Sequence, residues 1–356
     1  MNWPARSISV IGRKLSSFGY ESIETPTFEF FDVFSKEIGT TPSKELYKFF
    51  DKEGNTLVLR PDFTPSIARC AAKYYMDETQ PIRFCYKGNT FINAGSLQGK
   101  LKEITQMGAE LMNDDSVEAD AEMIALVVES LLQTGLKEFQ LSIGEVEYFK
   151  GLCEEAGLST ETAEDLRELI SGKNLFGAEE LLKERNVCIE ERERLLKVSD
   201  FFGAVEILDE AENQVHNETS KQAVLHLKKL YEVLKAYGVE KYISFDLGML
   251  SKYHYYTGVI FKAFSYGVGD AIVKGGRYDK LLGCFGKSAP AIGFAVVIDD
   301  LLLSLERQNG TYQEKPVVQK ITYTESNYTE KLKTAQALRS EGRRVALIPE
   351  SERTEV

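Results

Sequence analysis

The sequence predicts an α+β fold: an antiparallel sheet flanked by helices, interrupted by a helical insertion and followed by a small α/β tail. Residues 82–92 and 101–112 are two long extended segments joined by a glycine-containing loop, which is typical of neighbouring antiparallel strands. Residues 148–236 are charged, leucine-rich and helical in periodicity, with few turn signals. Beyond Gly310 the pattern becomes strand, helix, strand.

The individual elements follow from local patterns in chain order. Apolar residues recur at helical spacing from Ile8 to Phe18, which predicts a first helix over residues 5–18. A second helix is expected from Thr64-Pro65 to about Met76, because a hydroxyl residue followed by proline is typical of a helix start. The other expected elements are helices at 117–134, 293–307 and 328–340, and strands at 20–26, 46–51, 56–59, 139–143, from 243, 253–264, 271–273, 317–323 and 344–348.

Changes in composition divide the chain into four parts. Residues 1–147 are expected to form the first part of the core and 148–237 the helical insertion. Residues 238–310 are then the second part of the core, and 311–356 form the short α/β tail. The tail is too short to be a robust independent domain.

The overall composition narrows the possible partners. Hydrophobic residues make up 43% of the chain and charged residues 28%, and no apolar run approaches the roughly 20 residues that cross a bilayer. The formal net charge of -12 disfavours tRNA and other polyanions, because their binding depends on cations that meet phosphates. We therefore expect neither a membrane nor a nucleic-acid partner.

The cysteines and the N-terminal residues indicate the compartment. Five cysteines lie far apart and form no C-x-x-C pair, so neither a zinc site nor a disulfide framework is expected. The first residues lack the apolar core and cleavage site of a secretory signal. These features predict a cytoplasmic protein without a bound metal.

Six separated segments carry a resemblance to a known family. Together, and in this order, they resemble the core of class II aminoacyl-tRNA synthetases, specifically the histidyl branch, over about residues 5–307. The resemblance implies a class II synthetase-like antiparallel sheet and a self-dimer formed through the first segment, which is similar to motif 1. The family also implies a strand or loop ahead of the first helix, for which little room is expected here. The segments are Gly19–Glu29, Leu59–Thr64, Arg83–Glu110, Tyr255–Gly258, Gly275–Asp279 and Ala291–Ala295.

Three positions that hold arginine in histidyl-tRNA synthetases hold other residues here. The registers of the motifs place them at Ile92, Ser251 and Asp300, and the acidic position after the first is Ala94. In the family, these arginines stabilise the negative charge that accumulates when ATP is attacked. Removing one preorganised group of this kind costs roughly 100- to 1000-fold in rate. Negligible adenylation, and therefore no catalytic residue, is expected.

The residues that the resemblance assigns to histidine binding are largely kept. An acidic residue can pair with an α-ammonium group, and a carboxylate or a tyrosine hydroxyl can bond an imidazole. Residues 106 and 110 share one strand face, about 13 Å apart, and could line two ends of one cleft. With the arginines absent, the ligand carboxylate is expected to be held less well. The expected histidine-binding residues are Asp62, which replaces a glutamate, and Thr64, Gln106, Glu110, Tyr255 and Tyr256.

Each of these residues also has a structural interpretation, which the sequence leaves open. Thr64 could be a helix N-cap. Gln106 and Glu110 could be polar positions on a solvated sheet face, where such side chains usually lie. Tyr255 and Tyr256 could be strand aromatics in the core.

The same holds for the remaining polar landmarks. Gly275-Gly276 could mark a turn, and Arg277 could form a surface ion pair. The three histidines have no metal-like spacing, so structural or exposed roles are expected for them.

A synthetase-like fold that keeps the amino-acid pocket but loses the ATP chemistry resembles one family, the regulatory subunits of ATP phosphoribosyltransferase. The resemblance implies a non-catalytic subunit that activates a short-form catalytic subunit in the first step of L-histidine biosynthesis. It implies that L-histidine binds as the feedback signal, with no cofactor, and that the full anticodon-binding domain is absent. A divergent histidyl-tRNA synthetase and a stand-alone amino-acid-binding adaptor are the alternatives.

Overall fold

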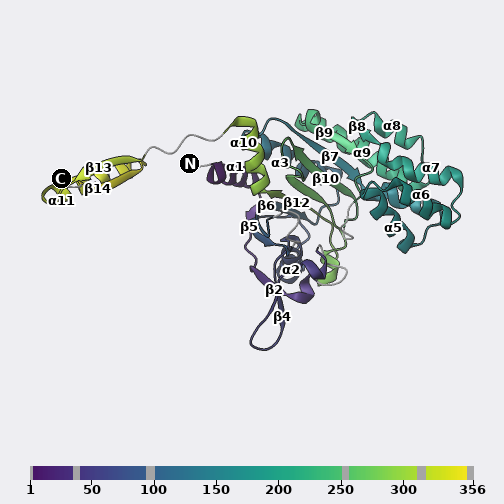
Figure 1. Ribbon diagram of the computed structural model, residues 1–356, viewed down its shortest axis with the longest axis horizontal. Helices are drawn as coiled ribbons and strands as arrows, with labels where there is room; N and C mark the ends of the chain where they lie inside the picture. Colours follow the sequence, from purple (N-terminus) through teal and green to yellow (C-terminus); the bar gives the residue numbers. More distant parts are fainter. Residues whose placement is uncertain (1–2, 35–40, 94–100, 251–255, 311–317, 351–356) are drawn as a thin grey trace, which may run out of the picture.

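A mixed sheet forms the centre of the molecule (Figure 1). The computed structural model describes residues 3–34, 41–93, 101–250, 256–310 and 318–350. Within them, nine strands follow the order β1-β5-β6-β12-β11-β10-β7-β9-β8. Pairing is antiparallel from β5 through to β7 and parallel at β1–β5 and β7–β9, which confirms the mostly antiparallel sheet. The strands are β1 (Glu21–Ser22), β5 (Ile82–Phe91), β6 (Glu103–Met112), β7 (Phe139–Glu145), β8 (Phe202–Gly203), β9 (Ile243–Asp246), β10 (Val259–Ser265), β11 (Val273–Arg277) and β12 (Ala291–Val297).

Helices cover the two faces of this sheet with different cores. One face packs against α1 (Trp3–Ser17), α3 (Val117–Thr134) and α10 (Ile298–Asn309), and the side chains of Ala109 and Leu111 point into that core. The other face packs against α2 (Thr64–Tyr74) in a smaller core that includes Phe63, Phe84, Tyr86 and Tyr278. Because side chains alternate along a strand, the even-numbered residues of β6 face α2.

The segment between β7 and β9 is the helical insertion that the sequence predicts. Its longest helix, α9, begins where the Asn217 side chain accepts from the Ser220 N–H, and it ends at Gly238 in the left-handed region. The two-residue strand β8 is an exception to the expected lack of strands. The helices are α4 (Val146–Glu155), α5 (Thr160–Ser171), α6 (Leu175–Glu184), α7 (Ile189–Lys197), α8 (Ile207–Glu212) and α9 (Glu218–Tyr237).

Two smaller sheets complete the described structure. A three-stranded antiparallel sheet has the order β2-β4-β3, and a parallel pair, β13 and β14, packs with α11. The second unit stands apart from the rest of the molecule (Figure 1) and confirms the predicted strand, helix, strand pattern. The elements are β2 (Phe28–Phe30), β3 (Lys48–Phe50), β4 (Thr56–Leu59), β13 (Gln319–Tyr323), α11 (Tyr328–Ser340) and β14 (Val345–Pro349).

Two expectations near the C-terminal half of the sheet are wrong. The helix expected from residue 293 begins only at Ile298, because residues 291–297 form β12 and pair with β6 and β11 on either side. Gly275-Gly276 lie inside β11 and do not form a turn. Periodicity does not distinguish a short apolar run in a buried strand from one in a helix, so pairing with two neighbouring strands decides the conformation of residues 291–297.

Candidate ligand-binding site

Glu110 lies at the centre of the α2-facing side of the sheet. Its side chain accepts hydrogen bonds from the Thr64 hydroxyl at 2.8 Å and from the Tyr278 hydroxyl. The residue is only 1% exposed, so the interpretation of Glu110 as a polar residue on a solvated sheet face is wrong. Burial raises the pKa of Glu110 to about 8, against the opposing effect of the two hydrogen bonds. Through these two hydrogen bonds, Glu110 connects Thr64, at the start of α2, with Tyr278, the residue after β11.

Thr64 and Asp62 lie at the N-terminus of α2, where the sequence places the ammonium end of the site. The interpretation of Thr64 as an N-cap is wrong: it is the first helical residue, and its hydroxyl is turned to Glu110. Asp62 accepts instead from the Thr64 backbone N–H at 3.3 Å. Its carboxylate is half-buried and lies close enough to Glu110 to contribute to that residue's raised pKa. These contacts bring Asp62, Thr64 and Glu110 together as predicted.

Glycines form the floor beneath these side chains. Phe84, Glu110, Gly293 and Gly276 are paired in a row across four strands. A Cβ on Gly293 would lie 1.6 Å from Glu110 Oε2, so its absence lets the glutamate extend across β12 toward Tyr278. The sequence marked this glycine only as part of a motif, and its packing role is visible only in the sheet register.

Gln106 shares the strand face of Glu110, four residues away. Its side-chain oxygen Oε1 is buried and has no hydrogen-bond partner in the described part of the chain. The paired residue on β5 is Gly88, and the side chains of Arg60 and Phe63 occupy the space that a Cβ at Gly88 would take. An unpaired buried acceptor is costly unless something donates to it, so this atom is available to a ligand.

The two tyrosines of the predicted site have different outcomes. Tyr255 lies outside the described residues. Tyr256 is half-buried at the edge of the smaller core, with its ring against Gly276, where a Cβ would come within 2.7 Å of the ring. The structure thus places Tyr256 on the α2-facing side of the sheet, where Glu110 also lies, and its ring occupies the space that a side chain at position 276 would need.

The structure describes two of the three positions at which this chain lacks the arginine of histidyl-tRNA synthetases, Ile92 and Asp300. Ser251 and Ala94 lie outside the described residues. Ile92 follows β5 and pairs its N–H with the Lys102 carbonyl oxygen at 3.0 Å. Asp300 lies in the first turn of α10, next to Asp299, whose carboxylate accepts the Thr105 N–H at 2.8 Å. An aliphatic and an acidic side chain offer no cation to a triphosphate.

Arg60, which belongs to the same motif as Asp62, has a structural role. Its guanidinium donates to the carbonyl oxygens of Asn89 and Thr25, both at 2.8 Å, and stacks over the Phe63 ring at 4.1 Å. The residue is buried, and Gly88 provides the space for it. Arg60 therefore fixes the loop before α2, which sets where Asp62 and Thr64 lie.

Arg277 is not the surface residue that its type suggests. It is 5% exposed, and its Nε donates to Asp120 Oδ1 at 2.9 Å. Asp120 also lies 3.1 Å from His226, which in turn contacts Glu145 at 3.0 Å. This network could not be predicted from the sequence, because its members come from α3, β7, α9 and β11 and meet only in the fold.

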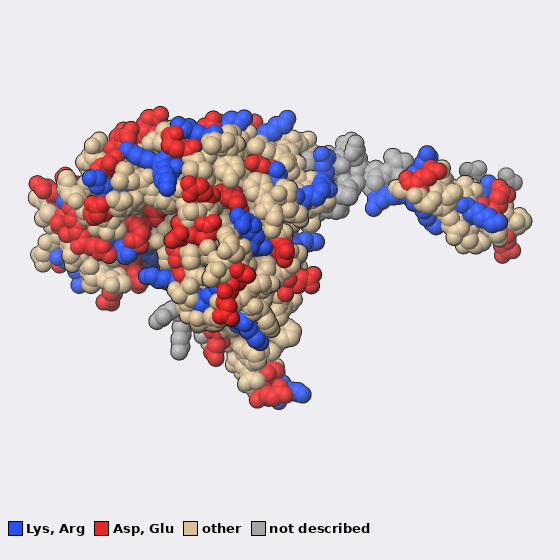
Figure 2. Space-filling view, turned by 180° about the vertical axis from the view of Figure 1, so that it is seen from behind, with Lys and Arg blue, Asp and Glu red and all other residues tan. Residues whose placement is uncertain are grey.

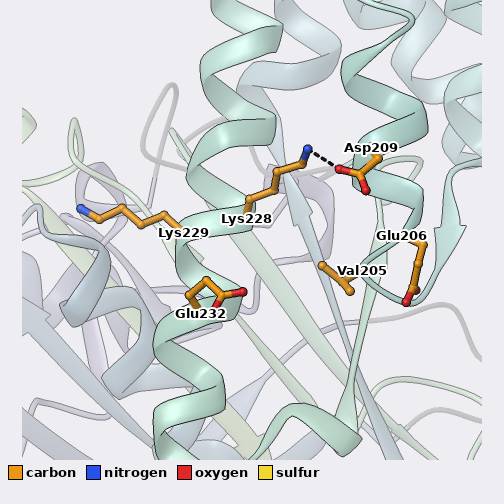
Figure 3. A pocket seen from close by; sticks show the side chains of 6 residues that line it. All are labelled: Val205, Glu206, Asp209, Lys228, Lys229 and Glu232. Carbon is orange, nitrogen blue, oxygen red and sulfur yellow. Dashed lines mark hydrogen bonds and ion pairs between the residues drawn. The ribbon is translucent and has the colours of Figure 1, made fainter.

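A shallow surface pocket lies on the helical insertion (Figure 3), far from these residues in the sequence. Val205, Glu206 and Asp209 line one side of it, and α9 lines the other. Lys228 is paired with Asp209 at 2.5 Å, so the most prominent cation of the pocket is already neutralised. This is the ordinary chemistry of a solvated helix surface.

The outer surface is consistent with the acidic composition. Figure 2 shows acidic side chains gathered over the helical insertion, with basic side chains scattered among them. None of the helices in the described ranges is both long and apolar enough to cross a bilayer. Among the same residues, no cluster of three or more His, Cys, Asp or Glu side chains is arranged to hold a metal ion.

Comparisons with known proteins agree with the fold. The family model of histidyl-tRNA synthetase matches residues 7–301. A crystal structure from Bacillus halodurans, described as an ATP phosphoribosyltransferase regulatory subunit/histidyl-tRNA synthetase, has a TM-score of 0.89 at 33% identity. That match covers 99% of this chain and 90% of the other. Histidyl-tRNA synthetase from Nostoc sp. PCC 7120, at 21% identity and a TM-score of 0.82, shares the fold.

The curated relatives are more specific. The ATP phosphoribosyltransferase regulatory subunit of Acetivibrio thermocellus is 43% identical, over 91% of this chain and 78% of the relative. That of Ruminiclostridium cellulolyticum is 41% identical, over 92% of this chain and 78% of the relative. Taken with the motif positions that lack arginine, these matches show that the chain belongs to the ATP phosphoribosyltransferase regulatory subunits, non-catalytic proteins of histidine biosynthesis with a histidyl-tRNA synthetase-like fold.

Proposed function

We propose that this regulatory subunit binds L-histidine on the α2-facing side of its sheet and relays that signal to a short-form ATP phosphoribosyltransferase catalytic subunit. The observation that carries the proposal is Gln106 Oε1, a buried acceptor without a partner, on the same strand face as Glu110. A free α-ammonium group would supply the missing donor.

In this proposal, the two ends of histidine meet different residues. Asp62 pairs with the α-ammonium group and Gln106 accepts a second hydrogen bond from it, since both offer oxygen acceptors. Glu110, held by Thr64 and Tyr278, closes the imidazole end together with Tyr255 and Tyr256. With Ile92 and Ser251 at positions where the family has arginines, the ligand carboxylate is held less well, so binding is weaker than in a synthetase.

Calorimetry of the purified complex with its catalytic subunit tests this site. Replacing Gln106 by Leu is expected to weaken L-histidine binding by about 10- to 100-fold, the range for a hydrogen bond to a charged group. Gln222→Leu, on the exposed surface of α9, is the matched control and should leave affinity unchanged. Wild-type affinity in the Gln106 variant, or no heat of binding in the wild type, would refute the site.

The same cleft is proposed not to make aminoacyl-adenylate, and the acidic chain is proposed not to bind tRNA. An aliphatic residue at Ile92 and a carboxylate at Asp300 cannot stabilise the charge on ATP. Robust histidine-dependent ATP–pyrophosphate exchange would favour the synthetase alternative instead. We also propose a cytoplasmic location, in keeping with five free cysteines, and a division into core (1–147 and 238–310), helical insertion (148–237) and tail (311–356).

We further propose that the chain pairs with a second copy through the face of the small sheet formed by Phe28, Phe30 and Phe49. Phe28 and Phe30 are more than half exposed, and Phe28 contacts Phe49 edge-on at 5.8 Å. Contiguous exposed aromatics are typical of an interface. Phe30→Asp is expected to convert the dimer to a monomer in light scattering, whereas Phe176→Asp, which removes an even more exposed ring from the insertion, should not.

A further inference from the structure

The end of β11 places two neighbouring side chains on opposite faces of the sheet. Tyr278 points to the α2 side, where its hydroxyl donates to Glu110. Arg277 points to the α3 side, where its guanidinium donates to Asp120. Both directions follow from the alternation of side chains along an extended chain. A displacement of this short segment therefore changes contacts on both faces at once.

The backbone of Arg277 also anchors the segment that carries Tyr256, a residue of the predicted site. Its carbonyl oxygen accepts the Thr257 N–H at 2.8 Å, and Thr257 directly follows Tyr256. The Thr257 hydroxyl accepts the Asp279 N–H at 3.0 Å, and the Asp279 carboxylate accepts from Arg277 at 3.2 Å. Two aromatic side chains of the site are thus tied to one arginine through short contacts.

Beyond Arg277, buried charges continue into the helical insertion. Asp120, which is fully buried on α3, lies between Arg277 and His226 of α9. His226 Nδ1 lies 3.0 Å from the carboxylate of Glu145, the last residue before the insertion begins. Burial opposes a charge on His226, but hydrogen bonds to the two carboxylates override it and raise the pKa of His226 to about 9.

We propose that Arg277, Asp120 and His226 are positioning residues that couple the ligand site to the helical insertion. The inference rests on the proposed function, since it assigns the route by which an occupied site alters the rest of the subunit. A buried ion pair has few alternative arrangements, because each must keep every charge compensated. Movement of Tyr278 on ligand binding would therefore be passed on through Arg277 and Asp120 to α9.

Hydrogen–deuterium exchange of the full-length protein tests this coupling. Saturating L-histidine is expected to slow amide exchange in α9 of the wild type by about fivefold or more, a typical coupling between sites. In His226→Gln, affinity measured by calorimetry should stay near that of the wild type, while the protection of α9 is lost. His216→Gln, an exposed histidine of the same insertion, is the control and should retain that protection.

A second comparison needs no ligand. Tyr278→Phe removes the hydroxyl that donates to Glu110 and is expected to speed exchange in α9 of the wild type but not in the His226→Gln background. Equal effects in both backgrounds would overturn the coupling. So would a wild type that binds histidine without protecting α9. If the protein does not bind histidine, the proposed ligand site is refuted. The coupling is still supported if Tyr278→Phe speeds exchange in α9 only when His226 is present. Circular dichroism shows whether each variant keeps its fold. If His226→Gln does not fold, Glu145→Gln serves as the second variant, because it changes the other partner of His226.

Discussion

Replacing Asp120 by Ala is expected to lower the free energy of unfolding by about 3–5 kcal/mol, the usual cost of removing one partner from a buried ion pair. Asp120 is fully buried and faces two cationic groups, Arg277 and His226. Without it, both cations would remain inside the protein, Arg277 with only its longer contact to Asp279 at 3.2 Å and His226 with only Glu145. Urea unfolding followed by circular dichroism at neutral pH measures the change.

The protein carries its own control for this prediction. Asp209 pairs with Lys228 at 2.5 Å, but its side chain is 73% exposed. Exposed pairs contribute about 1 kcal/mol or less, so Asp209→Ala should have little effect on unfolding. If the two alanine variants lost similar stability, the buried network would not be the electrostatic support described above.

Gly293→Ala is expected to have the largest effect on the ligand site. The new Cβ would lie 1.6 Å from Glu110 Oε2, and Glu110 cannot retreat without losing its bonds to Thr64 and Tyr278. Overpacking of a buried site costs about 1–3 kcal/mol of stability. We also expect loss of measurable L-histidine binding, because the displaced carboxyl no longer closes the cleft. Thermal unfolding and calorimetry measure the two effects.

Gly283→Ala separates this clash from a general effect of adding a methyl group. A Cβ at Gly283 meets nothing within 4 Å, and its backbone does not lie in the left-handed region. This variant should therefore keep both stability and binding. Unchanged binding in Gly293→Ala would mean that Glu110 is not part of the ligand site.

The segments with strong local signals were predictable. The bounds of α3 match the expected residues 117–134, because a serine cap and a following glycine mark both ends. The missing arginine at Ile92 and the carboxylate at Asp300 could be read from motif register alone. Strand β12 was not predicted, since periodicity does not separate a short apolar run in a strand from one in a helix, and pairing with β6 and β11 decides its conformation.

The site residues show the same division. Asp62, Thr64, Gln106 and Glu110 could be selected from their order in the sequence, but not their partners. Glu110 is enclosed by Thr64, which lies 46 positions away in the sequence, and by Tyr278, which lies 168 positions away. These contacts depend on how the sheet brings distant segments together. Tyr278 itself was visible only as part of a glycine-rich motif.

By itself, the sequence determined the type of most elements, the family and the loss of the cationic groups, because these depend on residue identity and short-range spacing. The tertiary structure alone decided which polar groups are buried and what compensates them. Arg277 could be assigned to the surface by residue type, yet it lies between β11 and α3 beside Asp120. The reason is physical: a charge can be buried only where an opposite charge or hydrogen-bonding groups from other segments compensate it, and strand pairing and helix packing decide where these groups meet.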